Sequence, residues 1–143
     1  MTFWTDRLDL TVAGKVDAPP VVETLKMGLL DEWGPGWARK RWEPQPELMG
    51  ANNSLFGGYV AALADQILTF ASMTVVPDGI AFRTVNLQVQ FMKVGRAHPL
   101  LIEGRVTAHS KRLVTVEADF RRDDGELIAR ANAQQIILPQ DHG

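Results

Sequence analysis

One carboxylate stands out because of the residues around it. Asp65 is the only charged residue between Glu47 and Asp78, and it lies in an apolar segment, residues 57–73, that is typical of a buried helix. A carboxylate in apolar surroundings requires a polar partner or a chemical role. A structural explanation is also open, in which the side chain reaches solvent at a helix edge or bonds to Thr69 one turn later.

A glycine pair begins the same segment. Gly57 and Gly58 would let a ligand approach the free N–H groups of a first helical turn, where the helix dipole is positive. Such a site can stabilise an oxyanion, although two glycines can equally serve a tight turn or close packing. The eight residues from Gly57 to Asp65 span about 12 Å of helix, too far for one chain to use both on a single carbonyl. Two antiparallel helices across a dimer axis would bring Gly57 of one chain near Asp65 of the other.

The predicted helix has two different faces. Val60, Leu63, Ile67 and Phe70 form an apolar stripe at helical spacing. Asp65 points almost opposite, on a small and mildly polar face that also includes Ala61, Leu68, Thr69 and Ser72. We expect this second face to lie close to a dimer partner and to leave a narrow polar slot.

Periodicity predicts the elements around this helix. Residues 1–20 show no regular pattern, residues 21–31 have helical spacing and residues 37–42 are typical of a short strand. After a turn at residues 77–79, apolar and polar residues alternate in four stretches, 84–91, 102–108, 114–121 and 127–137. A helix that is apolar on nearly all sides cannot bury its whole surface against one flat sheet. We therefore expect an α+β fold in which an antiparallel meander of strands curls around the helix and a second copy covers the rest.

The bulk composition excludes several classes of function. A net charge of −2 leaves no electrostatic footprint for nucleic acid, and the absence of cysteine excludes disulfides, thiol nucleophiles and cysteine zinc sites. The first residues do not resemble a signal peptide, and Asp65, Gln66 and two glycines interrupt the apolar stretch 55–76, which disfavours a membrane span. We expect a cytoplasmic protein.

The segment that runs from Asn53 to Asp65, Asn-Ser-Leu-Phe-Gly-Gly-Tyr-Val-Ala-Ala-Leu-Ala-Asp, resembles the signature of hotdog-fold acyl-CoA thioesterases. The subgroup it resembles most is the phenylacetate-degradation type, whose relatives include 4-hydroxybenzoyl-CoA thioesterase. The usual pattern of that subgroup is an asparagine, a short gap, His-Gly-Gly and a helix bearing Leu-Ala-Asp or Leu-Ala-Glu. The likeness continues through 84–91, the Lys111-Arg112 turn and 124–129, and so covers residues 37–138.

The resemblance implies a fold and an activity. The fold would be a hotdog domain at 37–139, an antiparallel sheet wrapped around one long central helix, with an N-terminal segment at 1–36 that holds a short helix and a tail at 140–143. The activity would be hydrolysis of an acyl-CoA to a free acid and coenzyme A, without a metal or other cofactor. The protein would be a homodimer or a dimer of dimers (a homotetramer), with no nucleic-acid or membrane partner.

The resemblance also implies roles for particular residues. Asp65 would be the general base or the nucleophile, the N–H of Gly57 from the partner subunit would polarise the thioester oxygen, and Thr84 with Asn52 or Asn53 would position water. The remaining candidates would bind substrate, namely Phe56, Gly58 and Phe91 around the thioester, and Lys111 and Arg112 at the phosphates of coenzyme A. Lys93 and Arg96, on a turn expected nearby, could join that basic patch, although basic residues at strand ends often form only a solvated rim.

One departure from the family pattern favours an alternative function. Phe56 stands where most of the family has histidine, and Ser110 stands where glycine is common. A hotdog dimer that lost this histidine could bind an acyl-CoA or a fatty acid without hydrolysing it, as a sensor or carrier. Phe56 could instead form one wall of the acyl pocket.

Other chemistries fit the sequence less well. Hotdog dehydratases need a histidine paired with a carboxylate, and none of His98, His109 and His142 lies in the expected loop or helix. No pair of histidines has the spacing of a metal site, and no serine lies in a Gly-x-Ser-x-Gly context.

Overall fold

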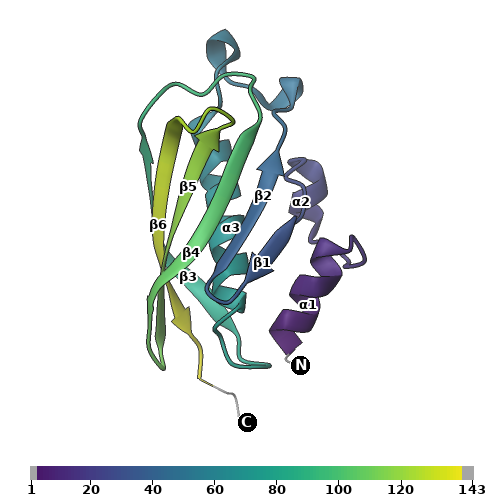
Figure 1. Ribbon diagram of the computed structural model, residues 1–143, viewed down its shortest axis with the longest axis vertical. Coiled ribbons are helices and arrows are strands. Elements are labelled where there is room, and N and C mark those ends of the chain that lie inside the picture. The colour runs from purple at the N-terminus through teal and green to yellow at the C-terminus, as the bar shows by residue number, and fades with distance from the viewer. Residues whose placement is uncertain (1–2, 140–143) are drawn as a thin grey trace.

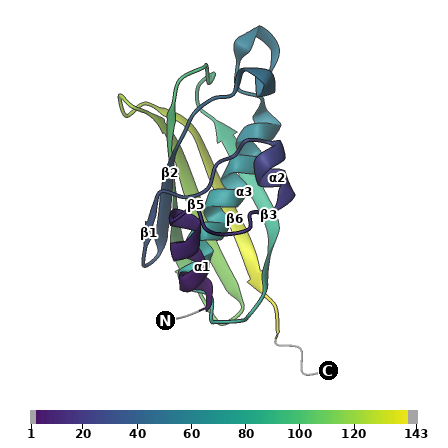
Figure 2. The same ribbon diagram turned by 90° about the vertical axis from the view of Figure 1, so that its right-hand side faces the viewer.

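The computed structural model describes residues 3–139, so the predicted tail, with His142, lies outside it. These residues form one six-stranded sheet with a long helix against its inner face and two shorter helices beyond that helix (Figures 1 and 2). The helices are α1 (Phe3–Val12), α2 (Pro20–Thr24) and α3 (Gly57–Met73), and the 3-10 turns η1 (Pro46–Leu48) and η2 (Ala51–Asn53) precede α3. The strands are β1 (Glu32–Gly34), β2 (Trp37–Trp42), β3 (Phe82–Phe91), β4 (Leu100–His109), β5 (Leu113–Arg122) and β6 (Leu127–Ile137). Among the helices of this described part, none is long and apolar enough to cross a membrane.

The order of strands across the sheet is β1-β2-β4-β5-β6-β3, and every neighbouring pair is antiparallel. Strands β4, β5 and β6 form a meander, as predicted. The prediction was wrong for the first of the four strands, because β3 pairs with β6 at one edge of the sheet while β4 pairs with β2. Alternation of apolar and polar residues identifies a strand, but it does not say which strand lies beside it. On β3 it also fails to give the inward face, because the pairing is irregular between Thr84 and Asn86 and Val85 is exposed.

Helix α3 covers the inner face of the sheet and begins and ends where the sequence predicts. Leu63, Ala64, Ile67 and Leu68 are fully buried between the helix and the strands. The prediction of two faces is wrong in part, since Leu68 and Ser72 lie in the core, whereas Phe70 from the apolar stripe is only half-buried. Asp65 is exposed in the single chain and lies on α3 between strand β3, which its carboxylate contacts, and the N-terminal helices.

The N-terminal segment is more ordered than the sequence suggests. Residues 3–12, expected to be irregular, form α1, which packs through the fully buried Leu8. The Trp4 indole N–H donates a hydrogen bond of 3.1 Å to the carbonyl of Ile80, and so fastens α1 to the turn after α3. The helix expected at residues 21–31 is reduced to the five residues of α2, because Lys26 (φ 49°) and Gly28 (φ 73°) leave the helical region. Figure 2 shows α1 and α2 on the side of α3 that faces away from the sheet.

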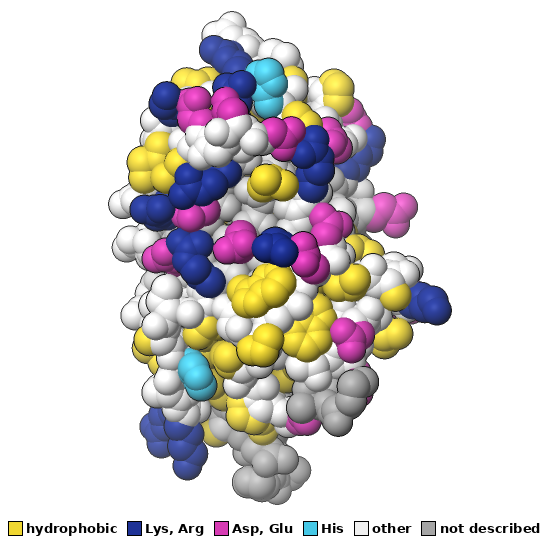
Figure 3. Space-filling view, in the orientation of Figure 1, with side chains coloured by type: hydrophobic (Ala, Val, Ile, Leu, Met, Phe, Trp, Pro, Cys, Tyr) yellow, Lys and Arg dark blue, Asp and Glu magenta, His cyan; other side chains and the backbone are white. Residues whose placement is uncertain are grey.

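The opposite, outer face of the sheet is turned to the viewer in Figure 3 and carries charged side chains of both signs. Inward positions on β5, such as Val114, Val116, Ala118 and Phe120, are fully buried, as the alternating pattern predicts. The sheet therefore has one face packed on α3 and one face open, and the candidate site lies on the α3 side.

Candidate functional site

Asp65 and Thr84 meet between α3 and β3. The hydroxyl Oγ1 of Thr84 donates a hydrogen bond of 2.8 Å to Oδ1 of Asp65. The pairing of β3 with β6 is irregular between Thr84 and Asn86, so the strand bends beside the carboxylate. The carboxylate thus has a partner on another element, different from the Thr69 considered from the sequence. Two of the predicted site residues are therefore in contact.

A third polar residue supports this pair and was not identified from the sequence. Gln135 on β6 is fully buried, and its Nε2 lies 3.0 Å from Thr84 Oγ1 and 3.2 Å from Thr69 Oγ1. Its Oε1 accepts a hydrogen bond from the hydroxyl of Ser72. A glutamine among the inward alanines and isoleucine of the last strand was a visible signal, because a buried amide requires partners.

Gly57 and Phe91 lie at the other end of α3. A side-chain carbon added at Gly57 would come within 3.2 Å of Cζ of Phe91, so the glycine permits a close approach there. Within residues 3–139, the N–H of Gly57 donates no hydrogen bond. This is expected, because Gly57 is the first residue of α3 and the N-cap side chain makes no capping bond. A cavity of about 460 Å³ opens beside this amide, with Val60, Leu100 and Phe120 among its lining residues.

The loop before α3 holds the other predicted residues of this region. Asn52 and Asn53 lie in η2 with positive φ values of 56° and 55°, and both side chains are exposed. Phe56 is the N-cap residue of α3 and is 62% exposed. A carbon added at Gly58 would come within 3.1 Å of the Phe56 ring, so this glycine lets the ring lie over the first turn of the helix. The asparagines and Phe56 lie on the side of Gly57 in this chain, away from Asp65.

A second cavity, of about 440 Å³, has Asp65 in its wall. One side of this cavity is α3, and the other side is formed by α1, α2 and the segment between them. Its lining is largely apolar and includes Trp4, Val22, Phe70 and Met73. This volume lies within the range of about 300–1,000 Å³ that small-molecule sites occupy.

A buried lysine holds the N-terminal side of this cavity against α3. Lys40 on β2 is 3% exposed, and its Nζ donates a hydrogen bond of 2.6 Å to the carbonyl of Met27 and another to Oε1 of Gln66. Burial lowers the pKa of Lys40 to about 7, against the opposing effect of the negative charge on Asp31. Gln66 is the neighbour of Asp65 in the chain, so the turn after α2 is fixed directly beside the carboxylate.

The basic residues expected to form one patch lie at two ends of the sheet. Lys111 and Arg112 are exposed on the turn between β4 and β5, and the carbonyl of Arg112 bonds Ile137 at the end of β6. Lys93 and Arg96 follow β3, whose last residue, Phe91, pairs with Ala129 near the start of β6. The first pair is therefore at the Thr84 end of the sheet and the second at the Gly57 end, so one chain does not bring them together.

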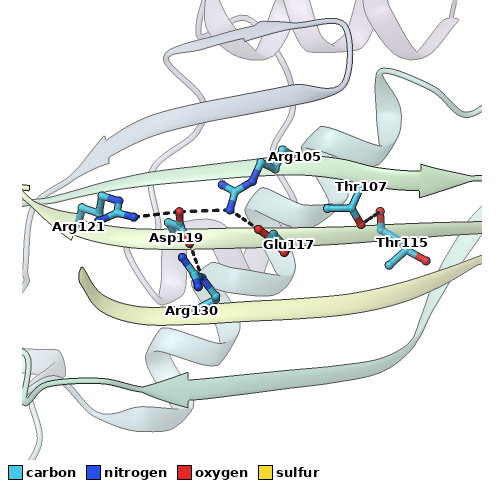
Figure 4. Close-up of polar contacts among 7 residues, drawn as sticks. All are labelled: Arg105, Thr107, Thr115, Glu117, Asp119, Arg121 and Arg130. Carbon is cyan, nitrogen blue, oxygen red and sulfur yellow. Dashed lines mark hydrogen bonds and ion pairs between the residues drawn. The ribbon is translucent and has the colours of Figure 1, made fainter. Parts of the chain in front are cut away.

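An ionic cluster occupies the outer face of the sheet (Figure 4). Asp119 accepts hydrogen bonds from Arg130 at 2.9 Å and from Arg105 at 3.2 Å, and Arg121 lies 3.4 Å away. Burial works against ionisation of this carboxyl, but the hydrogen bond from Arg130 and the three positive charges hold the pKa of Asp119 below its ordinary value. Since the sheet separates this cluster from α3, it is not part of the candidate site. In the described part of the chain, no group of three side chains that could hold a metal ion is present.

Comparisons with known proteins agree with this architecture. The sequence pattern of the thioesterase superfamily matches residues 52–129, which include Gly57, Asp65 and Thr84. A protein of Saccharolobus solfataricus named as an esterase is 30% identical over 104 residues, which are 71% of this chain and 67% of the relative. A thioesterase structure from Ralstonia eutropha JMP134, described as related to phenylacetic acid degradation, has a TM-score of 0.80 at 21% identity and covers 90% of this chain and 98% of its own.

A structure from Streptococcus mutans bound to acetyl CoA has a TM-score of 0.71 at 20% identity, with 78% of this chain and 88% of that chain covered. At these identities the likeness to both structures shows a shared fold, and the antiparallel sheet packed on α3 is the hotdog arrangement. The match to the family pattern covers more than half of the sequence, with the glycine pair, the carboxylate of α3 and the β3 hydroxyl inside it. The chain therefore belongs to the thioesterase superfamily and is a hotdog-fold thioester hydrolase.

Proposed function

We propose that the protein hydrolyses acyl-CoA thioesters and that Asp65 is its catalytic carboxylate. The observation that carries this proposal is the carboxylate of Asp65, oriented by the Thr84 hydroxyl at 2.8 Å and lying in the wall of an apolar cavity. Binding of acetyl CoA by the related Streptococcus mutans structure supports a coenzyme A thioester as the substrate class. Because coenzyme A thioesters are made and used inside cells, the proposal places the protein in the cytoplasm.

The proposed reaction adds water across the thioester without a metal. As general base, Asp65 takes a proton from water while the water oxygen attacks the carbonyl carbon, and the carbonyl oxygen becomes an oxyanion. The oxyanion then reforms the carbonyl, the C–S bond breaks and the proton passes to the departing thiolate, which gives a free acid and coenzyme A. As nucleophile, Asp65 would first form an acyl anhydride that water then opens, and the same two products result.

We infer that the site is shared between two subunits. The N–H of Gly57 lies about 12 Å of helix from Asp65, so the oxyanion donor must come from a second α3 that runs antiparallel to the first. Strand β3 supports such a dimer, because its outer edge has no strand partner within residues 3–139 and Val85 on it is 56% exposed. Exposed apolar residues at the Gly57 end, Phe56, Phe91, Met92 and Val94, add surface that a partner would cover. A dimer of dimers is compatible with the same shared site.

The remaining predicted residues take roles consistent with their positions. Thr84 orients the carboxylate, and Asn52 or Asn53 of the partner positions water from the Gly57 side. Phe56, Gly58 and Phe91 surround the entry to the thioester, and Lys111 with Arg112 meets the phosphates of coenzyme A at the Thr84 end. We propose that the acyl group itself enters the cavity between α3 and the two N-terminal helices, because that cavity is apolar and contains Asp65.

The test follows release of coenzyme A with a thiol reagent over a panel of short, long and aryl acyl-CoAs. The protein has no cysteine, so it adds no thiol signal of its own. Asp65→Asn should keep the fold and lower kcat by about two orders of magnitude or more. Asp78→Asn, at an exposed carboxylate in the turn after α3, is the matched control and should leave kcat unchanged. Normal turnover by Asp65→Asn would show that its carboxylate is structural.

The alternative function is a non-catalytic module that binds an acyl-CoA or a fatty acid. Phe56 favours it, because an exposed phenylalanine at the start of α3 replaces the histidine usual in the resembling family. Tight binding of acyl-CoA without release of thiol from any substrate would support this module and overturn the proposed hydrolysis.

A further inference from the structure

A chain of hydrogen bonds leads from the core of the protein to Asp65. Its central member is Gln135 on β6, which is fully buried on the side of the sheet that faces α3. The amide nitrogen of Gln135 donates to Thr84 at 3.0 Å, and Thr84 donates to Asp65 at 2.8 Å. The amide oxygen of Gln135 accepts from the hydroxyl of Ser72. The order of donation is therefore Ser72 to Gln135, Gln135 to Thr84 and Thr84 to Asp65.

The direction of these bonds matters because a hydroxyl has a single proton. Thr84 receives a hydrogen bond from the Gln135 amide, so its own proton is free to point at the Asp65 carboxylate. With the amide reversed, the Gln135 oxygen would face Thr84 and would compete with Asp65 for that proton. The observed orientation satisfies all three hydroxyls at once, because Ser72 donates to the amide oxygen while Thr69 and Thr84 both accept from the amide nitrogen. The buried amide thus selects which way the threonine hydroxyl points.

A purely structural role for Gln135 would not explain why its hydrogen bonds connect to Asp65. An amide in an otherwise apolar row, between Ala133 and Ile137, lowers stability unless its hydrogen bonds are made. The bonds of Gln135 go to Thr69, Ser72 and Thr84, and the last of these contacts the carboxylate directly. An alanine or leucine at this position would fill the apolar row without needing hydrogen-bond partners. What the amide contributes beyond packing is therefore the orientation of the Thr84 hydroxyl.

We propose that Gln135 is a positioning residue of the thioesterase reaction. It directs the proton of the Thr84 hydroxyl toward Asp65 and thereby holds the carboxylate in the orientation in which it acts, as base or as nucleophile. The inference rests on the proposed role of Asp65. It adds a residue on β6, beyond the residues 52–129 that match the family pattern.

The test replaces Gln135 by methionine, which has nearly the same size and no hydrogen-bonding amide. Thr69 and Ser72 lie on a helix, so their hydroxyls can donate to carbonyls one turn earlier once the amide is gone. The matched control is Gln134→Met, next to Gln135 on the same strand but on the exposed face. Gln135→Met should lower kcat about tenfold with KM unchanged, while Gln134→Met should change neither by more than about twofold.

A double-mutant cycle separates positioning from general destabilisation. If Gln135 acts through the Thr84 hydroxyl, adding Gln135→Met to Thr84→Val should lower kcat by less than about twofold further. A purely structural role predicts the same tenfold loss in both backgrounds, together with a matching loss of thermal stability, and that result would overturn the proposal. Thermal unfolding of all four proteins identifies any variant that fails to fold.

A crystal structure of Gln135→Met provides a readout independent of activity. We expect the contact of 2.8 Å between Thr84 and Asp65 to be lost or divided between two side-chain conformers, and to be retained in Gln134→Met. An unchanged contact in a single conformer would overturn the inference even if the protein proved inactive. Full activity of Asp65→Asn, by contrast, would overturn the proposed role of Asp65 and this inference with it, whereas an unchanged contact in Gln135→Met would overturn the inference alone.

Discussion

Replacing Gly57 by proline removes one N–H and little else. Proline is well tolerated at the first position of a helix, and Gly57 is the first residue of α3. The preceding residue, Phe56, has φ −70° and ψ 126°, which is the extended conformation that proline requires before it. The bonds of the first turn, from Tyr59 and Val60 to the carbonyl of Phe56 at 3.0 and 3.1 Å, do not involve the Gly57 amide. The variant should therefore fold normally.

The matched control is Gly57→Ala, which adds a carbon at the same place and keeps the N–H. In both variants that carbon meets Cζ of Phe91 at 3.2 Å, and this ring is 56% exposed and able to move aside. If the Gly57 amide donates to the oxyanion, Gly57→Pro should lower kcat by about 10²–10³, the usual effect of losing one such donor. Gly57→Ala should lower kcat by less than about threefold, since only the ring moves.

The assay is release of coenzyme A at saturating substrate, with thermal unfolding measured alongside. Equal kcat values for the proline and alanine variants would show that the Gly57 amide takes no part in the reaction. A loss in both would instead point to the position of Phe91.

Co-expression of Gly57→Pro with Asp65→Asn tests whether the site is shared. In a mixed dimer, one site combines the intact Gly57 of one chain with the intact Asp65 of the other. Random pairing should then restore about a quarter of the wild-type activity, although each variant alone is nearly inactive. Absence of this recovery in a confirmed mixed dimer would place both residues in one chain's site.

Two further predictions concern the buried lysine and the N-terminal cavity. The pKa of Lys40 is about 7 in the folded protein and close to 10.4 in the unfolded chain, so between these pH values the unfolded state binds more protons. The free energy of unfolding should therefore rise with pH in this range, by up to about 1.4 kcal/mol per pH unit. Urea unfolding from pH 6 to 9.5 should show this rise in the wild type but not in Lys40→Met, and parallel profiles would contradict it. Val22→Phe, which fills part of the cavity from α2, should lower kcat/KM for long and aryl acyl-CoAs about tenfold while sparing acetyl-CoA, and an equal loss on all substrates would place the acyl group elsewhere.

The central part of the fold was predictable because its signals are local. The glycine pair, the uncharged stretch around Asp65 and the turn at 77–79 define α3, and alternation of apolar and polar residues indicates β3, β4, β5 and β6. The strand order was not predictable in the same way, because the pairing of β3 with β6 joins residues about 45 apart in the chain. Helix α1 has weak amphipathic character, and tertiary contacts such as those of Leu8 and Trp4 stabilise it.

The candidate site was predictable to the extent that its residues have unusual neighbours in the sequence. Asp65 stood out for its surroundings, and Thr84 followed from the family resemblance. Gln135 and Lys40 each lie at an inward position of an alternating strand, so a polar residue in an apolar row was the available signal for both. Periodicity does not identify the hydrogen-bond partners of Gln135 and Lys40. Their bonds to Thr84 and to Met27 depend on how distant segments fold together.

The two N-terminal helices have a consequence for how this enzyme can change its substrate. They form one wall of the cavity that contains Asp65, yet they lie before the stretch that matches the family pattern. The proposed catalytic carboxylate and the wall opposite it therefore belong to separate stretches of the chain. Substitutions in residues 3–30 can reshape the space offered to an acyl group while Asp65, Thr84 and Gln135 keep their contacts, so selectivity and chemistry are open to independent adjustment, by evolution or by an engineer.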